Sequence, residues 1–134
     1  MTVEHLVIDA SALIDLVRAR GAGPGVRERV EGRRLHAPAH LDAEVLSGLG
    51  RLHRAGEVSA EAVEAQLAAV ARAPITKHEI SPLLAGSWAR RHEIRMADAL
   101  YVELADRLGL RLLTTDERLA RATRIAEAVV IPDT

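Results

Sequence analysis

The stretch LVIDASAL at residues 6–13 decides how the rest of the chain is interpreted. Its first three residues are apolar with no polar alternation, and Asp9 ends the run. An unbroken apolar run of this kind is typical of a strand buried on both faces of a sheet. Residues 10–20 follow directly and carry apolar side chains at helical spacing, with Gly21 after them. The stretch therefore predicts a buried strand that leads straight into a helix.

The same alternation of strand and helix patterns continues along the chain. Further strands are expected at residues 35–37, 75–80, 111–114 and 129–131, and helices at residues 24–30, 39–55, 59–72, 83–92, 97–108 and 117–122. No repeat, low-complexity tract or linker interrupts this order. The pattern predicts one α/β domain with a mostly parallel sheet, in which ligands bind beyond the carboxyl ends of the strands.

Length and composition limit the classes of protein that fit. The chain has 134 residues, 49% of them hydrophobic and 28% charged, with a formal net charge of −1. This length fits a single domain, which we expect to span residues 1–134, and is sufficient to bury a core. The lack of cysteine excludes disulfides, thiolate metal sites and cysteine nucleophiles. No long apolar window or signal-peptide pattern occurs, so we expect a cytoplasmic protein without membrane contact.

Four acidic residues stand where an α/β sheet places its ligands. Asp9 and Asp116 each come directly after an apolar strand, and Glu44 and Asp98 lie near the starts of helices. Carboxylates brought together in this way cannot all stay ionised without a cation, and Mg²⁺ or Mn²⁺ is the natural partner of oxygen ligands. A divalent ion in such a site activates water and offsets charge on a departing phosphate oxygen. The pattern indicates a metal site with the reaction left open.

Each acid also has a simpler interpretation when taken alone. Asp9, Asp98 and Asp116 lie at expected helix N-termini, where Asp is favoured as a cap or in the first turn. Glu44 alone is more typical of a solvated helix position. The placement of Asp9 and Asp116 at two strand ends is what favours the joint site.

Four motifs together resemble a known family. They are VIDASAL at residues 7–13, the segment 38–46 around Glu44, ADALY at residues 97–101, and LLTTDERL at residues 112–119. In this order and spacing, over nearly the whole length, the chain resembles the PIN domain and, more narrowly, the VapC-type ribonuclease toxins of bacterial toxin–antitoxin pairs. No departure from the pattern removes an acidic position.

The resemblance implies a fold, a site and partners. It implies a three-layer α/β/α sandwich, a catalytic and metal-binding quartet of Asp9, Glu44, Asp98 and Asp116, and hydroxyl positions beside the metal at Ser11 and Thr114. It also implies homodimerisation and a cognate VapB-type antitoxin that blocks the site. We therefore expect a Mg²⁺- or Mn²⁺-dependent endoribonuclease, in which Asp9 and Asp116 are inner ligands and Asp98 and Glu44 complete or orient the metal sphere.

The alternative from another class is a non-catalytic phospho-receiver or binding module with an acidic pocket. A receiver needs a phosphorylatable Asp at the end of a middle strand and a Lys at the end of a late one. The single lysine, Lys77, follows a weak strand, and no strand-end Asp lies between Asp9 and Asp116. A haloacid-dehalogenase-like phosphatase would need an acid at position 11, where this chain has Ser11.

The remaining polar residues receive more modest interpretations. We interpret all six histidines as structural or surface groups and most arginines as solvated helix faces, with Arg118 and Arg121 as the candidates for RNA contacts. Trp88 and Tyr101, the only aromatic residues, are expected in the core. Asp42 and Glu44 point about 200° apart on one helix, so only one of them can face the site, and Glu44 matches the family's position.

Overall fold

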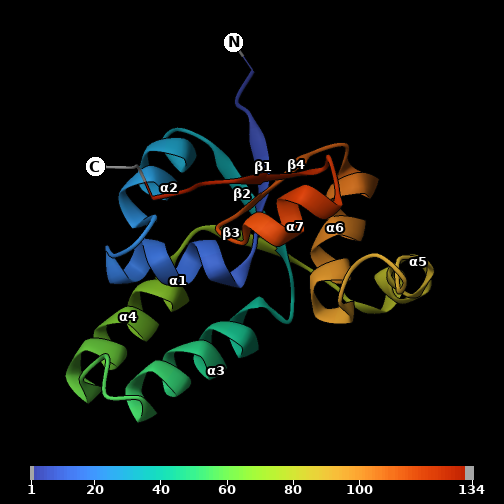
Figure 1. Ribbon diagram of the computed structural model, residues 1–134. Coiled ribbons are helices and arrows are strands. Elements are labelled where there is room, and N and C mark those ends of the chain that lie inside the picture. Colours follow the sequence, from blue (N-terminus) through green and yellow to red (C-terminus); the bar gives the residue numbers. More distant parts are fainter. Residues whose placement is uncertain (1, 132–134) are drawn as a thin grey trace.

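The computed structural model describes residues 2–131 and has one sheet of five parallel strands at its centre (Figure 1). Its strands are β1 (His5–Ile8), β2 (Arg34–Pro38), β3 (Ile75–His78), β4 (Arg111–Thr114) and β5 (Ala126–Ala128). They lie in the order β3-β2-β1-β4-β5, and each neighbouring pair is parallel. The first strand of the chain therefore occupies the middle of the sheet, and the order of connection reverses on either side of it.

Helices cover both faces of this sheet. They are α1 (Ala10–Arg18), α2 (Gly23–Val30), α3 (Leu41–Arg54), α4 (Ala60–Arg72), the 3₁₀ turn η1 (Ser81–Leu83), α5 (Leu84–Ala89), α6 (Met96–Leu108) and α7 (Glu117–Ala122). The chain moves outward from β1 to β3 and then crosses back to β4, so helices before and after β3 belong to opposite faces. Figure 1 shows α1 to α4 gathered on one side of the sheet and α5 and α6 on the other. The expected three-layer α/β/α arrangement is confirmed.

The two central strands form the core of the domain. Leu6, Val7 and Ile8 of β1 are fully buried, as are Leu112 and Leu113 of β4. Helices on both faces leave these strands no solvated side, which is why their sequences show no polar alternation. The apolar runs thus predicted the middle of the sheet correctly.

The strand predicted at residues 129–131 and the helix predicted at residues 83–92 have different bounds in the structure. The last strand is β5, three residues before the predicted strand at 129–131, and Val130 and Ile131 are exposed. β5 pairs with β4, which ends at Thr114, so only one further backbone bond, from Val129 N–H to the Thr114 carbonyl, continues the ladder. The helix predicted at 83–92 is shorter, because α5 ends at Ala89 and a turn follows.

The prediction that Trp88 lies in the core is wrong. Trp88 is 61% exposed, and the guanidinium of Arg91 lies over its ring, 4.8 Å from the centroid. The buried residues at this point are Leu83 and Ser87, which lie four apart and face α6. Because successive helical residues are rotated by about 100°, Trp88 points away from that face. Tyr101 is buried as predicted.

A buried acid joins α5 to α6. Glu103 is nearly buried, and Arg90 and Arg107 approach its carboxylate to 3.1 and 2.7 Å. Gly86 packs directly against this carboxylate, where a Cβ atom would overlap it. The ion pairs hold the turn between the two helices, which ends at Arg95 beside the sheet's carboxyl edge.

No helix among residues 2–131 is long and apolar enough to cross a membrane.

Candidate active site

The ends of β1 and β4 meet at the point where the order of the sheet reverses. The backbone N–H of Asp9 donates to the Leu113 carbonyl at 3.1 Å, so Asp9 follows β1 directly beside the end of β4. A reversal between neighbouring strands opens a crevice in which open α/β sheets bind their ligands. The strand ends that carry Asp9 and Asp116 therefore meet in one place.

Two hydroxyl groups link the strand ends. The Ser11 hydroxyl donates to Asp9 Oδ1 at 2.7 Å and accepts from the Thr115 N–H at 3.1 Å. The Thr114 Oγ1 lies 3.3 Å from the Ser11 Oγ and accepts from the Asp116 N–H at 3.0 Å. Ser11 and Thr114 thus occupy the positions beside the acids that the resemblance implied, and they align the two segments that carry Asp9 and Asp116.

Asp9 is a buried acid whose charge is poorly compensated. Its exposed fraction is 5%, and burial raises its pKa to about 6, although hydrogen bonds from Thr114, Ala12 and Ser11 act in the opposite direction. The charge of Asp98 raises the pKa further. Desolvation disfavours the ionised form unless a positive charge lies close by. The site therefore lacks a cationic partner for Asp9 among the described side chains.

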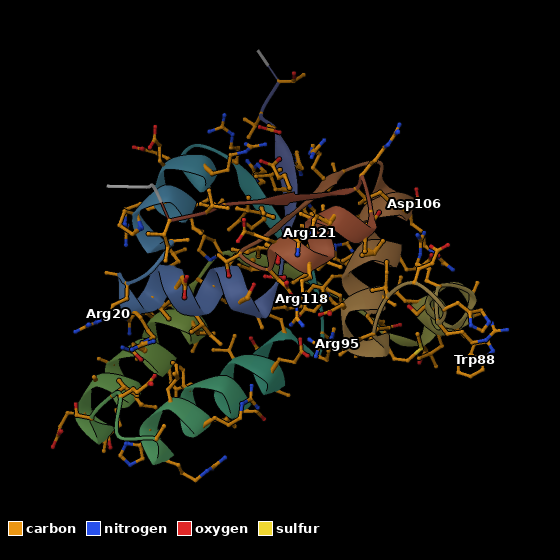
Figure 2. All side chains as sticks on the ribbon, viewed as in Figure 1. Arg20, Trp88, Arg95, Asp106, Arg118 and Arg121 are labelled. Atoms are coloured by element: carbon orange, nitrogen blue, oxygen red, sulfur yellow. The ribbon has the colours of Figure 1, made fainter. Side chains whose placement is uncertain are left out.

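Asp98 and Asp116 line a shared pocket between α6 and α7. The lining also includes Arg95 and Arg118, which stand 3.4 Å from Asp98 and 3.8 Å from Asp116. Both arginine side chains are more than three-quarters exposed, so these are weak surface pairs that a competing charge can replace. Figure 2 shows Arg95 and Arg118 close together at this pocket, whereas Arg121 lies on another side of α7.

Glu44 reaches the site from α3 and is held by a tyrosine. The Tyr101 hydroxyl donates to Glu44 Oε1 at 2.6 Å, and His40 Nε2 lies 3.4 Å from the same oxygen. Asp42 instead points to solvent and pairs with Lys77 at 3.0 Å. Glu44 lines a separate hollow with Ser47 and Arg51, and Tyr101, on which Asp9 and Asp98 also act electrostatically, is its link to the other acids.

Two of the four acids also cap helices. The Asp9 carboxylate accepts from the Ala12 N–H and caps α1, and the Asp116 carboxylate accepts from the Arg118 and Leu119 N–H groups and caps α7. The interpretation of Asp9 and Asp116 as helix caps is therefore correct, and it does not conflict with a role in the site. Asp98 lies in the first turn of α6 without capping it.

Comparison with known proteins identifies the family. The PIN domain family model matches residues 6–125. Ribonuclease VapC3 of Mycobacterium tuberculosis is 53% identical over 127 residues, which cover 94% of this chain and 93% of the relative. The chain is a VapC-type ribonuclease of the PIN-domain family. The family predicted from the four motifs is confirmed, and membership decides against a phospho-receiver or binding module.

Solved structures agree with the fold of this VapC-family chain. The crystal structure of PAE2754 from Pyrobaculum aerophilum has a TM-score of 0.72 and 27% identity, covering 95% of this chain and 84% of that one. A toxin–antitoxin complex from Klebsiella pneumoniae has a TM-score of 0.70 and 19% identity, covering 95% and 99%. The α/β fold with a parallel sheet is therefore shared with these proteins.

The donor set of this VapC-type site suits a hydrated divalent cation. Among residues 2–131, no three His, Asp or Glu side chains gather closely enough to form a cage of protein ligands. Mg²⁺ does not need such a cage, since it is commonly held by one or two carboxylates and keeps several waters. Asp9, buried with an uncompensated charge, is the observation that fits a cation here.

Several residues near the site were missed from the sequence. Arg95 directly precedes α6 and lies three positions before Asp98, and Tyr101 follows Asp98 by three positions within the helix. His40 was interpreted as a structural or surface group, yet it lies four positions before Glu44 and contacts it. Helical spacing could have indicated these neighbours, but only the fold shows that Tyr101 reaches across to α3.

Proposed function

We propose that this chain is the toxin of a toxin–antitoxin pair and cleaves RNA phosphodiester bonds with Mg²⁺ or Mn²⁺ at the carboxyl edge of its sheet. The observation that carries the proposal is Asp9, a buried carboxylate with no cationic partner at the point where the strand order reverses. Structural acids are normally paired or exposed, so a buried, unpaired acid on which the charge of Asp98 also acts favours a site for a cation.

Each acid has a role in this proposal. Asp9, Asp98 and Asp116 would hold the cation, and Glu44 would complete or orient its sphere. When bound, the cation supplies a more acidic water and offsets charge on the phosphate. The chain's own contribution is to hold these groups still: Asp9 is held by Ser11, and the Asp116 segment by Thr114.

The arginines at the pocket supply the attraction for RNA. A polyanion approaching four carboxylates needs positive charge at the rim, and Arg95 and Arg118 stand there. Each is weakly paired to an acid of the site, so a cation on Asp98 and Asp116 would leave both guanidinium groups available to phosphate oxygens. Arg121, also on α7 but outside the pocket lining, is the second candidate for an RNA contact.

Partners and location follow from the same proposal. We expect a cognate VapB-type antitoxin to cover the acidic pocket with a basic side chain, a homodimer of the toxin, and action in the cytoplasm on cellular RNA. The likeness to a toxin–antitoxin complex from Klebsiella pneumoniae supports the first of these. Co-expression with the small gene beside its own should yield a stable complex. Recovery of the chain alone, harmless at high expression in its host, would contradict the antitoxin.

The proposal is tested with purified protein and a pool of cellular RNA. Wild type and Asp42→Asn should cleave RNA with Mn²⁺ and not with a chelator. Asp9→Asn should nearly abolish cleavage, and Glu44→Gln should lower it by orders of magnitude. Asp42 is the matched control, since it is exposed on the same helix and its loss should cost below about 1 kcal/mol. Equal cleavage by Asp9→Asn, or cleavage in chelator, would refute the proposal.

A further inference from the structure

Two side-chain contacts join α3 to α6 across the candidate site. The Tyr101 hydroxyl of α6 donates to Glu44 Oε1 of α3 at 2.6 Å. His40, the residue before α3, donates from Nε2 to the Ala97 carbonyl in the first turn of α6 at 3.3 Å. α3 otherwise packs against α1 and α4, and α6 against the sheet and α5. These contacts therefore set the position of Glu44 relative to the turn that carries Asp98.

The tyrosine is a rigid donor. Its side chain is 1% exposed, so the core fixes the ring and the hydroxyl has one position. A separation of 2.6 Å is typical of a hydroxyl that donates to an ionised carboxylate, which is among the stronger hydrogen bonds. The contact holds the end of a side chain that would otherwise sample several rotamers.

The ring of His40 packs beside the tyrosine and near the same carboxylate. The rings of His40 and Tyr101 lie 4.8 Å apart, and His40 Nε2 is 3.4 Å from Glu44 Oε1. Nδ1 of His40 is buried without a hydrogen-bond partner among residues 2–131, so the ring makes its polar contacts through Nε2. Within the described part of the chain, the Tyr101 hydroxyl donates to Oε1 and no hydrogen bond reaches Oε2.

We propose that Tyr101, supported by His40, is a positioning residue that fixes the Glu44 carboxylate by one oxygen and directs the other toward the cation or its water. The inference rests on the proposed metal-dependent function and deepens it. This positioning role differs from simple packing in the hydrophobic core, because packing would need the ring of Tyr101 and not its hydroxyl. Residues that orient a metal's ligands typically contribute ten- to a hundredfold to metal affinity or activity.

The decisive variant is Tyr101→Phe, which keeps the ring and removes the hydroxyl. Mn²⁺ affinity, measured by titration calorimetry without RNA, should fall about tenfold. In cleavage assays kcat at fixed Mn²⁺ should fall similarly while KM for RNA stays within about twofold, since Tyr101 does not face the arginine rim. A thermal melt in chelator checks that the variant folds. His40→Phe, which keeps the ring contact and removes the nitrogen, should show a smaller loss of Mn²⁺ affinity.

A double mutant separates positioning from general structure. If Tyr101 acts through Glu44, then Tyr101→Phe combined with Glu44→Gln should bind Mn²⁺ no more weakly than Glu44→Gln alone. Additive losses, or wild-type Mn²⁺ affinity in Tyr101→Phe, overturn the inference while the proposed function stands. Wild-type protein that neither binds Mn²⁺ nor requires it for cleavage refutes the proposed function itself. Asp42→Asn, on the same helix as Glu44, is the matched control and should bind Mn²⁺ as wild type does.

Discussion

Replacing Asp9 with asparagine should stabilise the protein when no divalent cation is present. The carboxylate is 5% exposed, and burial raises its pKa from 3.8 to about 6. A raised acid pKa means that the folded protein binds the proton more tightly than the unfolded chain does. The stability that comes with the proton is complete below pH 4 and is lost as the pH rises through 6. At neutral pH the ionised Asp9 therefore opposes folding.

The size of the effect follows from the two pKa values. Each pH unit between them is worth about 1.4 kcal/mol, so ionised Asp9 costs roughly 3 kcal/mol. Asparagine is a good N-cap, and its carbonyl oxygen can keep the bonds from Ser11 and the Ala12 N–H. The NH₂ group of the asparagine would have at most one hydrogen-bond partner, Thr114, which lowers the gain. We therefore expect the free energy of unfolding to rise by about 1–3 kcal/mol.

The assay is urea unfolding of wild type and Asp9→Asn in chelator at pH 4.5, 5.5, 6.5 and 7.5. The difference in unfolding free energy should be small at pH 4.5, grow as the pH rises to about 6, and stay level above it. Asp42→Asn is the control, because Asp42 is exposed and paired with Lys77. Adding Mn²⁺ at pH 7.5 should stabilise wild type and not Asp9→Asn. If Asp9→Asn were less stable than wild type at every pH, or if its gain in unfolding free energy were the same at every pH, that result would refute the argument.

Other substitutions test packing and the arginine rim. Gly86→Ala should cost about 2–3 kcal/mol in urea unfolding, because its Cβ would displace the Glu103 carboxylate from two arginines. Gly50→Ala, whose Cβ inside α3 would meet only the Arg54 guanidinium at 3.8 Å, should instead raise the free energy of unfolding by about 0.5–1 kcal/mol. A loss of stability would contradict the helix at this position. Arg118→Ala should weaken RNA binding and reduce the slope of log affinity against log salt by about 0.7, whereas Arg20→Ala, beyond the end of α1 (Figure 2), should leave the slope unchanged.

The sequence predicted the parts of the fold that depend on local pattern. An apolar run bounded by Asp9 is a buried strand followed by a capped helix, because burial on both faces and capping are both visible in neighbouring residues. The helix predicted from residue 59 likewise begins there, because the Ser59 hydroxyl accepts from the Ala62 N–H and caps α4.

The errors come from features that depend on distant partners. Residues 129–131 are as apolar as a strand, yet the strand is Ala126–Ala128, because β4 supplies pairing only up to Thr114. The charged Glu127 is accommodated there since Arg29 and Arg111 approach it to 2.8 and 3.2 Å. Nothing in the local sequence shows these partners.

The candidate site was predictable in its acids and not in their supports. Strand ends and family motifs indicated Asp9, Asp98, Asp116 and Glu44 without any knowledge of distances. The contact between Tyr101 and Glu44 joins residues 57 positions apart, and it depends on how α3 and α6 sit across the sheet. That geometry is a tertiary property, so a single sequence shows only that a tyrosine is present.

The contact between the Ser11 and Thr114 hydroxyls also bears on when the site is completed during synthesis of the chain. The two residues are 103 positions apart, and they align segments that each carry an acid of the proposed metal site. A ribosome makes the chain from the N-terminus, at about 5–20 residues per second. Until β4 and Asp116 have emerged, the nascent chain holds only one half of the crevice. If the proposed site is correct, products of interrupted translation that stop before β4 lack Asp116 and should not cleave RNA.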